Sequence, residues 1–242
     1  MIQNTNHISP YIDIASAKKQ LTTNSRLVIK DFLLADYAEK IYQCLENDVP
    51  WQIAFRDEET NHVLEREQLD QMGPEKRAQL IQQIVEMAKH RYQFLYNRYP
   101  IVDAVLEGRN PDLFLNQVVE YFNSSSYLNF FHQLTNDAEI KKCSAQATWY
   151  APGNFLNYHT DVGSDEEDRR FAYVLNLSKE WRPDWGGLLH FVDEDKNTIT
   201  ETFIPKFNSL SIFKVPQGHY VSYVAPYTMK PRFSITGWFR AD

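Results

Sequence analysis

The sequence is poor in cysteine and has no long hydrophobic run. It contains 242 residues but only two cysteines, Cys44 and Cys143, so we expect no disulfide framework. We expect a reducing, cytoplasmic setting instead. No apolar run approaches the roughly 18 residues that a membrane-spanning helix needs. The N-terminus also lacks the basic and apolar regions of a signal peptide. The sequence therefore predicts a protein without a membrane partner.

Positive charge is also scarce. The 25 lysines and arginines are outnumbered by 32 acidic residues, which gives a net charge of −7. A nucleic-acid-binding surface is normally basic, so nucleic acid is not expected as a partner. Hydrophobic residues make up 43% of the chain and charged residues 24%, as in an ordinary globular protein.

The pattern of apolar residues changes near residue 140. Before this point helical spacing predicts helices over residues 35–45, 74–96, 113–122 and 124–134, with one strand over 26–33. Residues 1–24 are expected to begin irregularly, and 50–64 to form strand or loop. After residue 140, short β-branched and aromatic runs predict strands over 144–150, 170–177, 188–192, 198–203, 209–214, 219–224 and 232–239. We expect one domain, 1–242, with a mainly helical support, 1–140, on a β core, 141–242.

Two histidines and one aspartate in the β-rich half are candidate metal ligands. The triplet His159-Thr160-Asp161 is followed much later by His219. In a strand, residues i and i+2 point the same way, so His159 and Asp161 can reach one metal from the end of a strand. Two imidazoles and one carboxylate with open positions form the ligand set of non-haem Fe(II) oxygenases. Catalytic zinc uses similar ligands, but its usual His-Glu-x-x-His pattern is absent.

Arg232 and Ser234 follow the second histidine on the last predicted strand. Strand alternation places both side chains on one face. A guanidinium can grip a carboxylate with two parallel hydrogen bonds, and the serine hydroxyl can add a third. The pair is therefore a candidate site for a dicarboxylate cosubstrate. The alternative is an arginine that pairs with one of the protein's own acids.

Together these motifs resemble those of the 2-oxoglutarate- and Fe(II)-dependent dioxygenases, and the prolyl 4-hydroxylase-like branch is the most similar. The resemblance covers about residues 142–240. The residues that carry it are Tyr150, Gly153, Leu156, His159, Asp161, Gly186, Gly187, Leu189, His219, Val221, Val224, Arg232, Ser234 and Trp238.

The resemblance implies an α+β fold, in which N-terminal helices pack against a double-stranded β-helix, or jelly roll. The ligands of Fe(II) would be His159, Asp161 and His219. Arg232 would bind the distal carboxylate of 2-oxoglutarate with help from Ser234, and Tyr150 would face this cosubstrate. The implied reaction consumes O2 and 2-oxoglutarate, releases succinate and carbon dioxide, and hydroxylates a C–H bond.

Two nearby positions bear on this site. Some prolyl hydroxylases place a second tyrosine on the strand after the triplet, but the matching residue here is Val174, with Tyr173 on the opposite face. Cosubstrate binding would therefore depend more on Arg232. His190, after the double glycine, is expected to be structural, because a fourth ligand would close a site that needs open positions.

An acidic run over residues 165–168 follows the metal triplet. Such a run is most often a solvated loop. The resemblance adds the hypothesis that it is a mobile lid over the active site. Arg169 and Arg170 are expected to pair with its acids or to contact substrate.

The leading hypothesis is a dioxygenase that hydroxylates proline in a protein or peptide. The first alternative is a hydroxylase of a free amino acid or another small molecule, since a shared fold does not determine the substrate. The second alternative is a non-catalytic jelly-roll binding module. The intact set of His159, Asp161, His219 and Arg232 argues against this second alternative.

Overall fold

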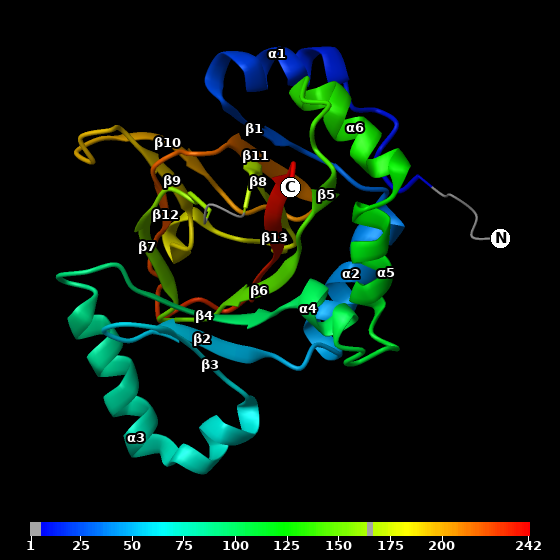
Figure 1. Cartoon of the computed structure of the whole chain (residues 1–242). Coiled ribbons are helices and arrows are strands. Elements are labelled where there is room, and N and C mark those ends of the chain that lie inside the picture. Colours follow the sequence, from blue (N-terminus) through cyan, green and yellow to red (C-terminus); the bar gives the residue numbers. More distant parts are fainter. Residues whose placement is uncertain (1–5, 164–166) are drawn as a thin grey trace.

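The computed structural model describes residues 6–163 and 167–242 of the chain. Its strands form one 13-stranded sheet, and Figure 1 shows this sheet curling into a barrel-like jelly roll. The strands are β1 (Arg26–Ile29), β2 (Gln52–Arg56), β3 (Asn61–Leu64), β4 (Phe94–Tyr99), β5 (Lys142–Cys143), β6 (Gln146–Tyr150), β7 (Phe155–His159), β8 (Arg169–Asn176), β9 (Leu189–Val192), β10 (Ile199–Phe203), β11 (Ser209–Lys214), β12 (His219–Val221) and β13 (Arg232–Arg240).

The order of the strands brings distant parts of the chain together. The main path runs β1-β11-β8-β13-β6-β4-β7-β12-β9-β10, and all of its pairs are antiparallel. The hairpin β2–β3 joins this path through β4, and β5 pairs with β13. The jelly roll expected for this chain is confirmed.

Helices cover the outside of the barrel. They are α1 (Ile14–Asn24), α2 (Ala35–Asn47), α3 (Arg66–Met87), α4 (Ile101–Leu106), α5 (Phe114–Phe122) and α6 (Ser125–Thr135). Figure 1 shows α1, α2, α5 and α6 on one side of the sheet, whereas α3 lies apart beneath the β2–β3 hairpin. The largest apolar core lies between the first group and the sheet, and it includes Phe122, Tyr127, Phe131 and Phe239. The packing of N-terminal helices on the β core is therefore confirmed.

The described part of the chain contains no helix that combines the length and the apolar character needed to cross a bilayer.

The structure differs from the sequence prediction mainly before residue 140. Within α3 the backbone leaves the helical conformation at Gly73, where φ is 78° and ψ is 164°, so the helix expected over 74–96 begins where predicted and a separate helical segment from Arg66 precedes it. This helix ends at Met87, because residues 94–99 form β4 and pair with β2, β6 and β7. Residues 14–24 form α1, and residues 155–159 form β7, which is not among the predicted strands. Strands β1 to β4 also belong to the common sheet, and the division of the chain near residue 140 stays a prediction.

Candidate active site

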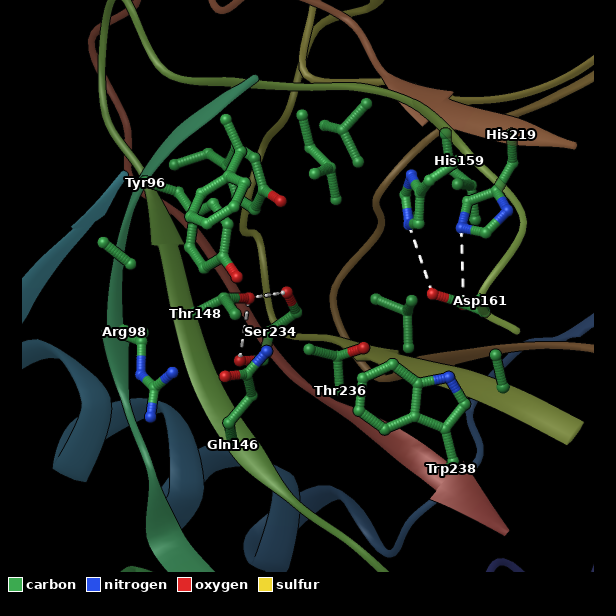
Figure 2. A pocket seen from close by; sticks show the side chains of 18 of the residues that line it. Tyr96, Arg98, Gln146, Thr148, His159, Asp161, His219, Ser234, Thr236 and Trp238 are labelled. Carbon is green, nitrogen blue, oxygen red and sulfur yellow. Dashed lines mark hydrogen bonds and ion pairs between the residues drawn. The ribbon is translucent and has the colours of Figure 1, made fainter. Parts of the chain in front are cut away.

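His159, Asp161 and His219 come together at one end of the barrel. Strand β7 pairs with β12 so that His159 lies directly opposite His219. The Nε2 atom of His159 lies 3.2 Å from one carboxylate oxygen of Asp161, and the Nε2 atom of His219 lies 3.5 Å from the other. One ligand atom from each residue lies within 4.8 Å of the others. Figure 2 shows both imidazole rings turned toward the carboxylate.

Backbone carbonyls orient both imidazoles. The Nδ1 atom of His159 lies 2.9 Å from the carbonyl oxygen of Asn157, and the Nδ1 atom of His219 lies 2.8 Å from that of Gln217. A carbonyl only accepts, so in each ring Nδ1 carries a proton and Nε2 is the nitrogen that faces the site. The two rings therefore have the tautomer that a metal requires.

Asp161 reaches the site through a turn of the chain. Strand β7 ends at His159, and Asp161 has a φ of 60°, in the left-handed region that aspartate tolerates better than most residues. The strand alternation expected for the triplet therefore does not explain its position.

The Arg169 side chain holds this turn in place. Its Nη1 donates to the Asp161 carbonyl oxygen at 3.3 Å, and its Nη2 pairs with Glu167 at 2.6 Å. Its guanidinium carbon lies 3.8 Å from the ring centre of Trp238 on β13. Arg170 points elsewhere and pairs with Asp137 at 2.8 Å. Of the proposed lid, residues 165 and 166 lie outside the described residues.

Burial sets the protonation states at the site. It lowers the pKa of His219 to about 4, and the neighbouring His159 adds to the effect. Burial alone would raise the pKa of Asp161, but the contact with Nε2 of His159 and the positive charge that His219 gains when it is protonated at low pH outweigh this effect and hold that pKa below its usual range. The site therefore presents a carboxylate and a neutral His219 imidazole near pH 7.

Arg232 is buried in the same cavity, with 2% of its surface exposed. Its Nε donates to the carbonyl oxygen of Gly187 at 2.6 Å, and its guanidinium carbon lies 4.6 Å from the ring centre of Tyr150. Burial lowers its pKa to about 10, so it stays charged at neutral pH. Among the residues that the structure describes, no carboxylate offsets this charge. The alternative of an arginine paired with one of the protein's own acids therefore finds no support in the described residues.

The double glycine makes room for this arginine. Gly187 has a φ of 62°, and a Cβ atom there would lie 2.9 Å from Cδ of Arg232. At Gly186 a Cβ atom would lie 2.0 Å from the carbonyl oxygen of Tyr223. Any larger residue at either position would collide with these neighbours.

The other predicted cosubstrate residues line the same cavity. Ser234 forms a 2.6 Å hydrogen bond with the Thr148 hydroxyl on the neighbouring strand (Figure 2). Tyr150 is buried, which raises its pKa well above the usual value, so its hydroxyl keeps its proton. Val174 lines the cavity too, whereas Tyr173 is buried in the core on the other side of the sheet, as strand alternation predicted.

Sequence reasoning missed Tyr96. It comes from β4, lines the cavity and stacks on Tyr150, with ring centres 5.2 Å apart (its position is seen in Figure 2). The cavity therefore contains a second tyrosine beside Tyr150, but this tyrosine comes from β4 and not from β8, the strand that carries Val174. The alternation of Phe94 and Tyr96 was the signal that could have revealed this strand.

The cavity has a volume of about 460 Å³ and holds both the metal candidates and the cosubstrate candidates. It is large enough for a small dicarboxylate and part of a substrate. His190 is not among its lining residues; its Nδ1 lies 2.8 Å from the Thr202 hydroxyl and its ring stacks on Tyr220. These contacts agree with a structural role for His190.

Two kinds of sequence similarity bear on this site. Residues 145–240 match the model of the 2OG-Fe(II) oxygenase superfamily. Prolyl 3-hydroxylase OGFOD1 of Xenopus laevis is 32% identical over 119 residues, which make up 47% of this chain and 22% of that protein. The protein of the same name from Mus musculus is 38% identical over 79 residues, or 30% of this chain and 14% of that protein. The matched region thus spans less than a quarter of the length of either curated relative.

Solved structures share the fold. A Pseudomonas putida prolyl-4-hydroxylase has a TM-score of 0.51 at 20% identity, with 95% of this chain and 99% of that one covered. A 2OG-Fe(II) oxygenase family protein from Burkholderia pseudomallei has a TM-score of 0.59 at 13% identity, with 98% and 97% covered. The superfamily implies Fe(II), 2-oxoglutarate and O2, and the His159–Asp161–His219 cluster fits the iron. Residues 145–240, which include all of the candidate metal and cosubstrate residues, therefore match the 2OG-Fe(II) oxygenase superfamily.

Proposed function

We propose that this protein is an Fe(II)- and 2-oxoglutarate-dependent dioxygenase that hydroxylates proline in a protein or peptide. The observation that carries the proposal is the buried charge of Arg232, which has no carboxylate partner among residues 6–163 and 167–242 and lies in the same cavity as the His159–Asp161–His219 cluster. A buried cation without a partner destabilises the fold, so it indicates a site for an anion that arrives as a ligand. The prolyl hydroxylase names of the curated relatives support the choice of proline.

In this proposal His159, Asp161 and His219 hold the iron. The two imidazoles present Nε2, and the carboxylate completes a set that leaves the remaining positions open. The ring of Phe213 packs edge-on to His219, with centres 4.7 Å apart, and keeps water from that side of the ligand.

Arg232 binds the distal carboxylate of 2-oxoglutarate. Its Nε is held by Gly187, which leaves the terminal nitrogens for two charge-assisted hydrogen bonds. Ser234 adds a hydroxyl to the same pocket, and Tyr150 with Tyr96 forms an aromatic wall against the cosubstrate chain. With O2 as the oxidant and 2-oxoglutarate as the source of two electrons, bound iron would supply the chemistry of C–H hydroxylation, while these residues orient the cosubstrate and exclude water.

We also propose a reducing, cytoplasmic location. Cys44 and Cys143 are both free and buried, which agrees with a protein that needs no disulfide.

The first test addresses iron and cosubstrate. Anaerobic addition of Fe(II) and 2-oxoglutarate to the purified protein should produce a weak visible charge-transfer band, which His159→Ala should abolish. His190→Ala is the matched control, because this histidine lies outside the cavity lining and should leave the band intact. If the wild-type protein gives no band and forms no succinate with any substrate, the oxygenase assignment is wrong.

The second test addresses the substrate. Proteins from cells with and without this enzyme should differ by the mass of one oxygen on specific prolines. If proteins are unchanged while small metabolites gain an oxygen, the enzyme hydroxylates a free amino acid or another small molecule instead.

A further inference from the structure

The strand β3 has a free edge beside the active-site cavity. Among the described residues, β3 pairs only with β2, so its other edge carries backbone N–H and C=O groups without strand partners. The helix α3 follows β3 along the chain and packs on the hairpin through Ile84, which contacts the cluster that includes Phe55 and Leu64. Free edges readily accept another strand, and natural proteins usually cover or interrupt them.

The hairpin geometry identifies the outward-facing groups. The Asp57 N–H donates to the Thr60 carbonyl oxygen at 3.1 Å, so this pair is hydrogen-bonded at the turn. Antiparallel pairs alternate between bonded and non-bonded. Phe55 with His62 is therefore a bonded pair, whereas Asn61 and Val63 sit in non-bonded pairs with Arg56 and Ala54. The backbone groups of Asn61 and Val63 consequently point to the free edge.

This edge borders the cavity. The cavity is lined by three consecutive residues of β3, namely Asn61, His62 and Val63. Val63 lies opposite Ala54 of β2, and both residues line the cavity, so this face of the hairpin is turned toward it. The His62 ring lies on the other face, where it stacks on Phe55 at 5.2 Å between ring centres and where Phe55 packs toward Ile84 of α3. Because β3 is the outer strand of the hairpin, its free edge lies at the border of the face that lines the cavity.

The rim next to this edge is apolar and exposed. Val63 is 42% exposed, Tyr92 is 39% exposed and Val162 is 68% exposed, and all three line the cavity. Val63 comes from β3, Tyr92 follows α3, and Val162 follows the metal triplet. Exposed apolar side chains that line the same cavity as a free strand can contact alternate side chains of a segment added to that strand.

We propose that a protein substrate binds as an extended segment that adds to the free edge of β3, so that one of its side chains enters the cavity. The backbone of Asn61 and Val63 would pair with this segment, and the rim of Val63, Tyr92 and Val162 would contact its side chains. This inference rests on the proposed oxygenase function and specifies its substrate as an unfolded or loop segment of a protein.

Pairing of the substrate segment with β3 restricts which residues can flank the proline that is hydroxylated. Proline has no N–H, so on a strand added to β3 it fits only where its nitrogen faces away from that strand. The residues immediately before and after it then face β3 and donate their own N–H groups. Hydroxylated prolines should therefore have non-proline neighbours, and proline repeats should be poor substrates.

Val63→Pro tests the inference directly. It removes the outward N–H of Val63, which makes no bond to β2, and should leave the hairpin intact. The matched control Val63→Ala shortens the side chain but keeps the N–H. The substrate is a peptide library from proteolysed protein of cells that lack the enzyme, and the readout is oxygen added to proline by mass spectrometry.

We expect Val63→Pro to lower the rate of peptide hydroxylation about tenfold or more, and Val63→Ala to lower it less than about threefold. The charge-transfer band and the slow succinate formation without peptide should match wild type in both variants, which shows that each is folded. If Val63→Pro hydroxylates peptides at the wild-type rate, the strand-addition inference is wrong while the oxygenase function stands.

A second measurement uses the peptide alone and does not depend on the fold of a variant. A synthetic peptide that contains the unmodified proline of a site hydroxylated in the library is compared with its analogue in which the amide N–H of the next residue is methylated. Equal rates for the two peptides would overturn strand addition. If the wild-type enzyme forms the band but hydroxylates no peptide of the library, the inference and the choice of a protein substrate both fail.

Discussion

Replacement of Arg232 by methionine should make the cosubstrate-free protein no less stable while abolishing its response to 2-oxoglutarate. The folded-state pKa of about 10 lies below the ordinary value of 12.5, which corresponds to about 3 kcal/mol of lost solvation at 1.36 kcal/mol per pKa unit. Because the folded pKa is the lower one, this cost is present at every pH below about 10 and disappears only above the unfolded pKa.

Methionine removes this cost and fills a similar volume. It also leaves the carbonyl of Gly187 without its hydrogen bond, which costs about 1–3 kcal/mol. The net change in the free energy of unfolding is therefore between zero and about 2 kcal/mol in favour of Arg232→Met. Most substitutions of buried residues change stability in the opposite direction.

Urea denaturation followed by tryptophan fluorescence measures both effects. With anaerobic Fe(II), a 2-oxoglutarate concentration of 100 times its Kd should stabilise the wild type by about 2.7 kcal/mol, and should not stabilise Arg232→Met. The control is Arg182→Met, which removes an exposed arginine paired with Asp184 at 2.7 Å and should change stability by less than about 1 kcal/mol. If Arg232→Met loses more than about 2 kcal/mol without cosubstrate, or is still stabilised by 2-oxoglutarate, the assignment of this arginine is refuted.

Three further predictions concern the residues around the metal and the cosubstrate. Because the folded pKa of His219 is about 4, the metal-free protein should lose stability as the pH falls from about 6.5 towards 4, and His219→Gln should flatten this loss in urea titrations at a series of pH values. Arg169→Ala should weaken Fe(II) binding about tenfold, measured by anaerobic titration, because it frees the turn that carries the aspartate ligand; equal losses in Arg170→Ala would show a general charge effect instead. Gly187→Ala should lower both stability and 2-oxoglutarate affinity, whereas Gly108→Ala, with a φ of 66° and nothing within 4 Å, should lower stability alone; unchanged cosubstrate affinity in Gly187→Ala would contradict the proposed role of the double glycine.

The spacing of apolar residues in the sequence predicted those helices and strands whose buried side chains recur at a regular interval. Tyr37, Ile41 and Leu45 recur every four residues, and all three are buried in α2. The alternation around Arg232 likewise marks β13, and the three metal candidates meet as their chemistry required.

The elements that sequence reasoning missed are defined by distant partners. Residues 94–99 follow a helix and contain charged and polar residues, so the alternation of Phe94 and Tyr96 is the one local signal that separates them from that helix. They form a strand because β2, β6 and β7 offer edges on both sides. The position of Asp161 shows a second limit of prediction from sequence. Its left-handed conformation is held by a contact with Arg169, which lies outside the triplet.

The carbonyl contacts of the two histidines have a consequence for how the protein handles its metal. Each imidazole is fixed by the carbonyl two residues before it, His159 by Asn157 and His219 by Gln217, so the orientation comes from the chain's own backbone. The proposed iron site is therefore organised before an ion arrives, and loading should cost little rearrangement. Protein made under iron starvation should recover its site on simple addition of Fe(II), and exchange with Mn(II) or Co(II) should proceed without unfolding.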